Sequence, residues 1–143
     1  MRALNVKEKV EYLRKKYGTD DPFKLAKDLD IIILYEDLGT ILGYFDAHFR
    51  MRTIHINTAA PDALKPYICA HELGHAVLHA KINTPYLSAY TLFSVAKIER
   101  QSNTFAVELL MPDSLIRDYP EHSIYNIARM AGIPKGMEQL KVI

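Results

Sequence analysis

The sequence predicts an α+β fold in which a small antiparallel sheet of about three strands packs with a mostly helical body. Short β-branched and alternating stretches are confined to residues 31–56, whereas helical spacing of apolar residues dominates before and after them. The chain of 143 residues has the length of one domain with one core. We therefore expect a single domain over residues 1–143, with its core at about residues 30–115 and C-terminal helices at residues 121–143.

Two helices are expected before the sheet. Apolar side chains recur at helical spacing over residues 6–17, and Gly18 provides a stop. Asp21 and Pro22 are typical of an N-cap and a first helical position, so they open a second helix that extends to residue 29.

Three strands are expected in the next part of the chain. The first is the β-branched run at residues 31–35, which is typical of a buried strand. The second lies around residues 41–45, next to Gly39 and Gly43. The third covers residues 49–56, where side chains of the two faces alternate.

The chain after Lys65-Pro66 has a helical pattern. A helix is expected over residues 66–80, and a linker rich in Tyr, Ser, Thr and Pro separates it from a long helix that ends at Met111. The remaining expected elements are the linker at residues 83–91, a short helix that begins at Pro112, and helical stretches at residues 124–131 and 135–142.

The composition argues against several classes of partner. The 18 basic and 17 acidic side chains leave a formal net charge of +1, which gives no general attraction toward nucleic acid or anionic lipid. The longest apolar run, residues 31–35, is far shorter than the ~20 residues needed to cross a bilayer. Cys69 is the single cysteine, so no internal disulfide can form. We expect a cytoplasmic protein with no membrane contact.

The segment His71-Glu72-Leu73-Gly74-His75 contains the candidate metal-binding and catalytic residues. Its two histidines are four residues apart, so on a helix they lie on one face and can bind one zinc ion. Glu72 stands beside the first of them, where it can take a proton from a water molecule as a general base. Gly74 allows a neighbouring element or substrate to come close. The alternative is an amphipathic helix that carries two solvent-facing histidines.

A catalytic zinc site needs a third protein ligand. His79 is excluded because it lies eight residues beyond His71, roughly 12 Å along a straight helix. Glu99 and Glu108 compete on the next long helix, and their nine-residue separation points them to opposite sides. Asn103, one turn after Glu99, can hydrogen-bond a ligating histidine, so Glu99 is preferred. A solvated carboxylate is the alternative interpretation for both glutamates.

Hydrolysis of a peptide bond also needs a donor for the oxyanion that develops at the carbonyl. His55, Tyr86 and Tyr90 are candidates because of their residue types and their places in the chain. The sequence does not choose among these three.

The stretch at residues 124–134 has the layout of a helix, a glycine turn and a second helix, which DNA-binding helix-turn-helix units share. The second half, PKGMEQLKVI, has few candidate base-contacting side chains and no concentrated basic face. Direct binding of nucleic acid is therefore not expected.

Two segments together resemble a known family. HELGHAVLH followed by ERQSNTFAVELLMP resembles the ImmA/IrrE family of zinc metallopeptidases, and ILGYFDAHFRMRTIHIN resembles the sheet that precedes the motif in that family. The resemblance covers roughly residues 30–115. The pairing of Glu99 with Asn103 also resembles the gluzincin arrangement, in which aspartate usually stands where this chain has asparagine. An amide adds no negative charge, so the basicity of the histidine ligand is expected to be lower.

The resemblance implies a zinc-dependent endopeptidase with His71, His75 and Glu99 as ligands and Glu72 as the general base. Members of the family often occur in prophages and mobile elements, where they cleave or inactivate a helix-turn-helix repressor, so the implied substrate is a transcriptional repressor. Manganese or iron could replace zinc at such a site. The alternative is a non-catalytic binding or regulatory module, associated with a repressor or a toxin–antitoxin pair, whose metal site is structural or vestigial.

Overall fold

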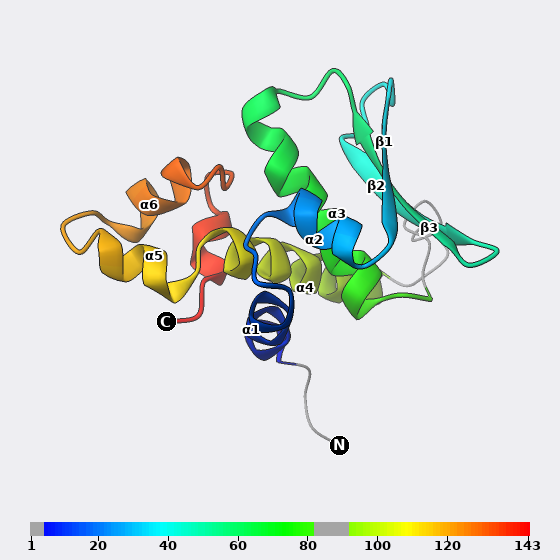
Figure 1. Ribbon diagram of the computed structural model, residues 1–143. Coiled ribbons are helices and arrows are strands. Elements are labelled where there is room, and N and C mark those ends of the chain that lie inside the picture. The colour runs from blue at the N-terminus through cyan, green and yellow to red at the C-terminus, as the bar shows by residue number, and fades with distance from the viewer. Residues whose placement is uncertain (1–4, 82–91) are drawn as a thin grey trace.

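The computed structural model describes residues 5–81 and 92–143, and it confirms the α+β class (Figure 1). The linker expected at residues 83–91 lies outside the described residues. In chain order, the elements are α1 (Val6–Tyr17), α2 (Pro22–Asp28), β1 (Ile31–Glu36), β2 (Gly43–His48), β3 (Met51–Asn57), the 3₁₀ helix η1 (Asp62–Leu64), α3 (Lys65–Leu78), α4 (Leu92–Leu110), α5 (Asp113–Asp118), α6 (Ile124–Met130) and the 3₁₀ helix η3 (Met137–Leu140).

The sheet is mixed, with the strand order β1-β3-β2. β2 and β3 form an antiparallel hairpin in which Gly43 lies opposite Ile56, whereas β1 and β3 are parallel. The expected number of strands is confirmed, but the expectation of a purely antiparallel sheet is wrong because β3 inserts between β1 and β2. The connection at residues 37–42 spans two interstrand gaps, about 10 Å, which six residues cover easily.

Asn57, at the end of β3, holds this connection in place. Its Nδ2 donates hydrogen bonds to the carbonyl oxygens of Gly39 and Ile41 at 2.9 and 2.8 Å. Its backbone N–H donates to the carbonyl oxygen of Leu42 at 2.9 Å. Asn57 therefore fixes the residues that lead into β2 to the end of the central strand, β3.

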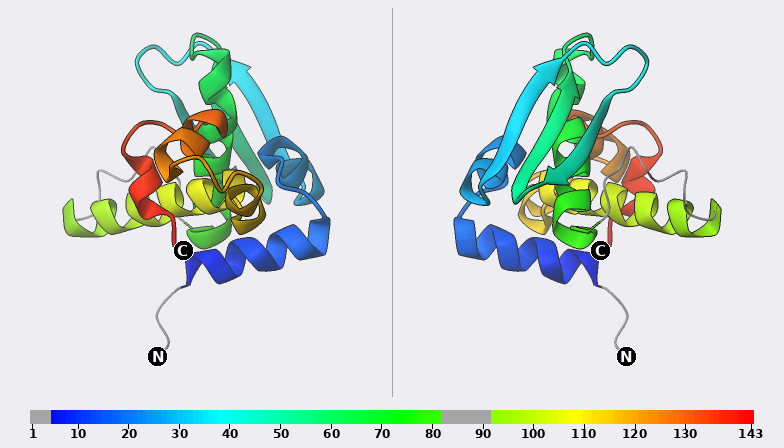
Figure 2. Two further views of the ribbon diagram at one scale, coloured as in Figure 1. Left: turned by 90° about the vertical axis from the view of Figure 1, so that its left-hand side faces the viewer. Right: turned by 90° about the vertical axis from the view of Figure 1, so that its right-hand side faces the viewer.

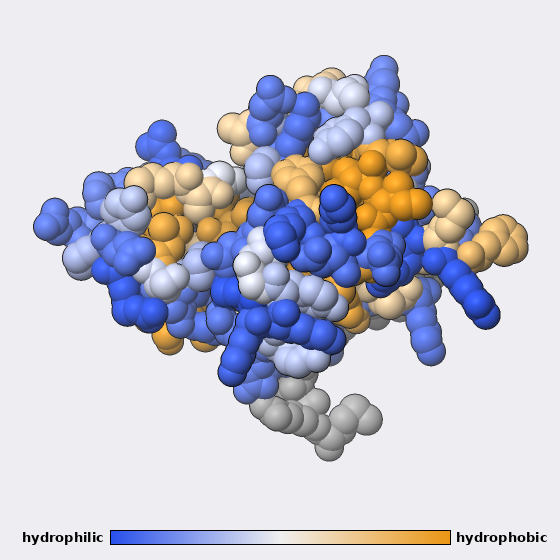
Figure 3. All heavy atoms as spheres, in the orientation of Figure 1, coloured by the Kyte–Doolittle hydropathy of each residue, from blue (hydrophilic) through white to orange (hydrophobic). Residues whose placement is uncertain are grey.

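β1 is less buried than its β-branched sequence suggests. Ile31 is buried, but Ile32 and Leu34 are 39% and 44% exposed, because they alternate onto the face of the sheet that points away from the core. Figure 3 shows apolar side chains gathered over this part of the sheet. The expectation of a buried strand at residues 31–35 is thus wrong for this outer face.

α3 is the central element of the structure. It contacts α2, α4, β2 and β3, and Figure 2 shows the sheet on one side of it and the C-terminal helices on the other. It begins at Lys65 with Pro66 at its second position, where the missing N–H costs nothing. It ends at Leu78, two residues before the expected end. None of the described helices combines the length and apolarity needed to cross a bilayer.

The core lies on both sides of α3. The sheet contributes Phe45, Ile54 and Ile56, which are fully buried against it. α4 contributes Phe105 and Leu109, also fully buried. Each such side chain stabilises the fold by roughly 1.5–3 kcal/mol, so the packing of α3 between these two layers supplies much of the driving force for folding.

Gly74 lies where α3 meets α4. A Cβ atom on this residue would stand 3.0 Å from Cβ of Phe105 and 3.1 Å from both Cα and O of Ser102. Two of these atoms belong to the backbone of α4 and cannot move aside cheaply. The expectation that Gly74 lets a neighbouring element come close is confirmed, and that element is α4.

The C-terminal stretch is attached to α4 through Glu108, whose side chain is fully buried. Lys141 Nζ donates a hydrogen bond to Glu108 Oε1 at 2.7 Å, and the backbone N–H of Val142 donates to Oε2 at 2.8 Å. The helix expected at residues 135–142 is reduced to η3, because the chain becomes extended at Lys141 and presents this N–H to the carboxylate.

We predict that Lys141→Ala lowers the free energy of unfolding by about 3–5 kcal/mol, because it leaves Glu108 buried without its cation. Chemical denaturation measures the change. Lys135→Ala is the matched control, since Lys135 is exposed in the same stretch of chain. The double variant Glu108→Met/Lys141→Met should recover most of the loss. A Lys141→Ala protein as stable as the Lys135→Ala protein would contradict this account.

We also predict that Gly74→Ala destabilises the fold by about 1–3 kcal/mol, because the added methyl group presses on the backbone of α4. In an unhindered helix the same change would stabilise by about 1 kcal/mol through helix propensity. The sign of the change in unfolding free energy, measured by denaturant titration, therefore distinguishes a close contact between α3 and α4 from an unhindered helix. A stabilised variant would show that the two helices are not in close contact here.

Candidate metal centre

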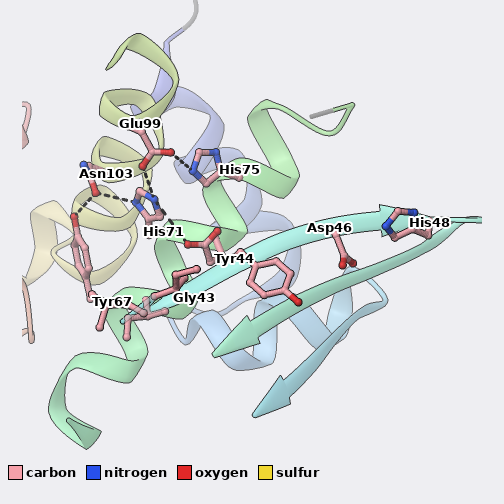
Figure 4. Close-up of a pocket in the computed structure, with 13 residues that line it drawn as sticks. Gly43, Tyr44, Asp46, His48, Tyr67, His71, His75, Glu99 and Asn103 are labelled. Atoms are coloured by element: carbon pink, nitrogen blue, oxygen red, sulfur yellow. Dashed lines mark hydrogen bonds and ion pairs between the residues drawn. The ribbon is translucent and has the colours of Figure 1, made fainter. Parts of the chain in front are cut away.

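Two histidines of α3 and one glutamate of α4 converge on one point (Figure 4). His71 Nε2 lies 3.0 Å from Glu99 Oε2, and His75 Nε2 lies 2.9 Å from Glu99 Oε1. One possible ligand atom from each residue lies within 4.8 Å of the others, an arrangement that no other group of His, Cys, Asp or Glu among the described residues reproduces. Two imidazoles and a carboxylate are a donor set that suits zinc and several other divalent ions.

The other ring nitrogen of His71 also has a partner. Its Nδ1 donates a hydrogen bond to Asn103 Oδ1 at 2.8 Å, and the hydroxyl group of Tyr67 donates to the same oxygen at 2.8 Å. The structure thus places Asn103 against a histidine of the cluster, as expected from its position one turn after Glu99. With Nδ1 bonded to Asn103, His71 turns its Nε2 atom toward the carboxylate of Glu99.

The charges of the three side chains are coupled. Burial alone would raise the pKa of Glu99, but hydrogen bonds from His71 and His75 outweigh it and hold the pKa well below its ordinary range. Burial alone would lower the pKa of His71, yet the hydrogen bond to Glu99 raises it overall. For His75, burial prevails and the pKa is lowered. In the metal-free protein, the cluster therefore holds an ionised glutamate and favours a proton on His71.

Glu72 lies on the same helix, and its side chain is buried at the edge of this cluster. Its Oε1 has no hydrogen-bond partner among the described residues, and its Oε2 lies 3.9 Å from His71 Nε2. Burial raises the pKa of Glu72 to about 7. A buried carboxyl oxygen with no partner is costly in a folded protein, which points to a group that interacts with something besides the chain itself.

A cavity of about 810 Å³ opens beside these residues. On one side it is lined by β2 and the residues that lead into it, and Figure 4 shows Tyr44, Asp46 and His48 along this strand. α3 and α4 form the other side. The described lining residues are Ile41, Leu42, Gly43, Tyr44, Asp46, His48, Tyr67, Ile68, His71, Glu72, His75, Glu99 and Asn103.

Gly43 allows the start of β2 to lie against α3. A Cβ atom there would stand 2.7 Å from Cγ2 of Ile68 and 2.8 Å from the carbonyl oxygen of His55. It would also lie 3.7 Å from Cγ of Glu72. Because only glycine fits, an edge strand of the sheet runs directly past the carboxylate of Glu72.

The remaining sequence candidates lie elsewhere. Glu108, the competing carboxylate, pairs with Lys141 instead of approaching the histidines. His55 is not among the described residues that line the cavity, because its ring stacks on Tyr44 at 4.1 Å and its nitrogens pair with Glu36 and Asp46. Tyr86 and Tyr90 lie outside the described residues.

Sequence reasoning missed several lining residues. Tyr67 could have been found, since it stands four residues before His71 and so continues the face of α3 that carries both histidines. Tyr44, Asp46 and His48 alternate on β2 and share one face of the strand, but nothing in their spacing indicates that this face adjoins α3.

The chain is similar to known proteins over most of its length. Residues 26–142 match the family model of Peptidase M78, described as the IrrE N-terminal-like domain. The chain is 41% identical over 139 residues to a Bacillus phage phi105 protein named uncharacterized immunity region protein 2, covering 95% of this chain and 88% of the relative. It is 31% identical over 118 residues to metallopeptidase ImmA of Bacillus subtilis strain 168, covering 81% of this chain and 69% of the relative. The resemblance found in the motifs is confirmed, and the chain belongs to the Peptidase M78 family of IrrE N-terminal-like metallopeptidases.

Proposed function

We propose that this protein is a zinc-dependent endopeptidase whose substrate is a transcriptional repressor. The observation that carries the proposal is the convergence of His71, His75 and Glu99 at the wall of a cavity, beside a carboxyl oxygen of Glu72 that has no partner in the described part of the chain. In this proposal the first three residues hold the ion. The donor set fits the group, since each oxygen of Glu99 already faces one Nε2 atom.

Glu72 is assigned the role of general base. When bound, the divalent ion supplies Lewis-acid chemistry, polarising the scissile carbonyl and acidifying water. Glu72 Oε1 accepts a proton from the attacking water molecule and then delivers it to the nitrogen of the departing amine. Burial of this carboxylate strengthens its interaction with the proton, because little bulk water competes for it.

The substrate is expected to bind as an extended segment along β2. The cavity follows this strand, and Tyr44, Asp46 and His48 on one face of it line the cavity. Ile41 and Leu42 precede it, are exposed, and line the same cavity, so they offer apolar contacts to substrate side chains. A peptide in this position passes Glu72.

The choice of a repressor as substrate rests on the family and on the relatives. The resemblance to ImmA/IrrE proteins implies action on a helix-turn-helix repressor, and one similar protein is named for a phage immunity region. The other is named metallopeptidase ImmA. Both names agree with a protease that acts in the control of a phage or mobile element.

We predict that Glu72→Gln keeps the fold and the bound metal but abolishes cleavage, because an amide cannot accept the proton. Purified wild type and variant are incubated with candidate repressors, and new N-termini are identified by mass spectrometry. A loss of at least about 100-fold in rate is expected for removal of a general base. Wild-type cleavage by the variant would overturn the proposed role, and repressor inactivation that persists without cleavage would support a binding module.

Metal content provides the control for this experiment. Mass spectrometry on the wild type should give about one zinc ion per chain, as a site with three protein ligands requires. His75→Ala and Glu99→Ala should lose the ion while remaining folded. Wild type that binds no metal after zinc is supplied would refute the proposed peptidase.

Glu72 should also make the free energy of unfolding depend on pH. Burial raises its pKa to about 7 from the ordinary value of 4.5, so between these values the folded state keeps a proton that the unfolded state has released. This group therefore lowers the free energy of unfolding as the pH rises through that window. At about 1.4 kcal/mol per pKa unit, the effect amounts to roughly 3 kcal/mol.

We predict that Glu72→Gln removes this pH dependence. In chelator-treated protein, the stability of the variant relative to wild type should rise between about pH 4.5 and pH 7 and then level off. Denaturant titrations at several pH values measure the difference. Parallel stability profiles for the two proteins would show that Glu72 is not protonated in the folded state.

A further inference from the structure

We propose that His79 is a positioning residue that, together with Gln101, orients His75 for the metal. The proposal rests on the metal site described above and extends it to a second pair of supporting residues. His71 already has such support from Asn103 and Tyr67.

His79 lies beside His75 because α3 ends just before it. The helix stops at Leu78, and His79 adopts φ −132° and ψ 46°, outside the helical region. Its backbone N–H still donates to the carbonyl oxygen of His75 at 2.8 Å, so the last turn remains closed. This change of backbone direction lets the side chain of His79 reach both His75 and α4.

Two contacts link His79 to its neighbours. Its Nδ1 lies 3.4 Å from Nδ1 of His75, and its Nε2 lies 2.7 Å from Oε1 of Gln101. The first is long for a hydrogen bond, and the second has ideal length. The two ring nitrogens of His79 therefore face a second histidine and an amide oxygen, respectively.

The partners of His79 determine which of its two ring nitrogens carries hydrogen. An amide oxygen only accepts, so Nε2 of His79 carries hydrogen and, in the neutral ring, Nδ1 has a free lone pair. With the ion bound, that lone pair would accept the hydrogen on Nδ1 of His75. The Nε2 atom of His75, which donates to Glu99 in the absence of the ion, would then carry no hydrogen and could hold the ion. Ligating histidines generally need such a partner on the opposite nitrogen.

The contacts that orient His71 and His75 both depend on amide side chains of α4. Gln101 and Asn103 both belong to α4, two and four residues after Glu99, so one helix supplies the carboxylate, the acceptor for His71 and the acceptor that orients His79. Both acceptors are neutral amides. A carboxylate in either place would add negative charge near Glu72, whose pKa burial has already raised.

The test compares the zinc affinity of His79→Phe with that of wild type, by competition with a chromophoric chelator. Phenylalanine keeps the ring and removes both nitrogens, so affinity should fall roughly 10- to 100-fold, the usual effect of losing such a partner. His79→Asn should recover most of the affinity, because its amide oxygen takes the place of Nδ1. His122→Phe is the matched control, since His122 is exposed and far along the chain from the cluster.

Gln101 provides a second readout that a packing role would not give. Gln101→Leu should weaken zinc binding less than His79→Phe, because His79 can still accept from His75 in one of its two tautomers. If Gln101 acts on His75 only through His79, the double variant should bind zinc no more weakly than His79→Phe alone. Multiplying losses in the double variant would overturn the proposal.

Each failure has a separate meaning. If His79→Phe binds zinc as tightly as wild type, the role of His79 is refuted while the metal site stands. If the wild type binds no zinc, both the metal site and the role of His79 are refuted. Circular dichroism of the metal-free proteins shows whether each variant folds, and if His79→Phe does not, His79→Asn and Gln101→Leu still decide the question.

Discussion

The distance between α3 and α4 is the constraint on which the rest of the centre depends. It is set at Gly74, where the backbone of Ser102 occupies the space that a side chain would need. Glu99 lies one turn before Ser102 on α4, so its carboxylate reaches the histidines on either side of Gly74. A wider helix spacing would separate the carboxylate from both rings, although every residue of the motif would still be present.

The same close packing removes water from the charges that it assembles. Two histidines donate to Glu99 and hold its pKa low, whereas burial raises the pKa of Glu72, whose Oε1 has no donor within residues 5–81 and 92–143. Two carboxylates that are neighbours in space thus have opposite tendencies, set by their partners. An ion that binds between the histidines must displace the proton held on His71, so binding and proton release are linked.

The local parts of this structure could be predicted from the sequence, whereas the long-range parts could not. Helical spacing places His71 and His75 on one face, and Asn103, one turn after Glu99, favours Glu99 over Glu108 as their neighbour. The parallel pairing of β1 with β3 was not accessible, because strand order depends on contacts between distant segments and not on the pattern within each strand. The cavity wall along β2 was missed for the same reason.

His79 shows a different limit. A straight helix separates it from His71 and Glu99 but gives no indication of its contact with His75. The helix ends two residues earlier than its apolar pattern suggests, and helix ends are the features that such patterns define least well. The exposed outer face of β1 has a similar origin, since a β-branched run does not reveal which side of a strand is covered.

The buried pairing of Glu108 also bears on how the chain is made. The groups that neutralise this carboxylate, Lys141 and Val142, leave the ribosome 33 and 34 residues after it. Until then α4 carries a charge in the middle of an apolar surface, and burying that charge alone would cost several kcal/mol. The nascent helices can associate in that interval, but the packing around Glu108 closes only after this later segment emerges. Final consolidation of the domain is thereby delayed until the segment that carries Lys141 and Val142 has left the ribosome.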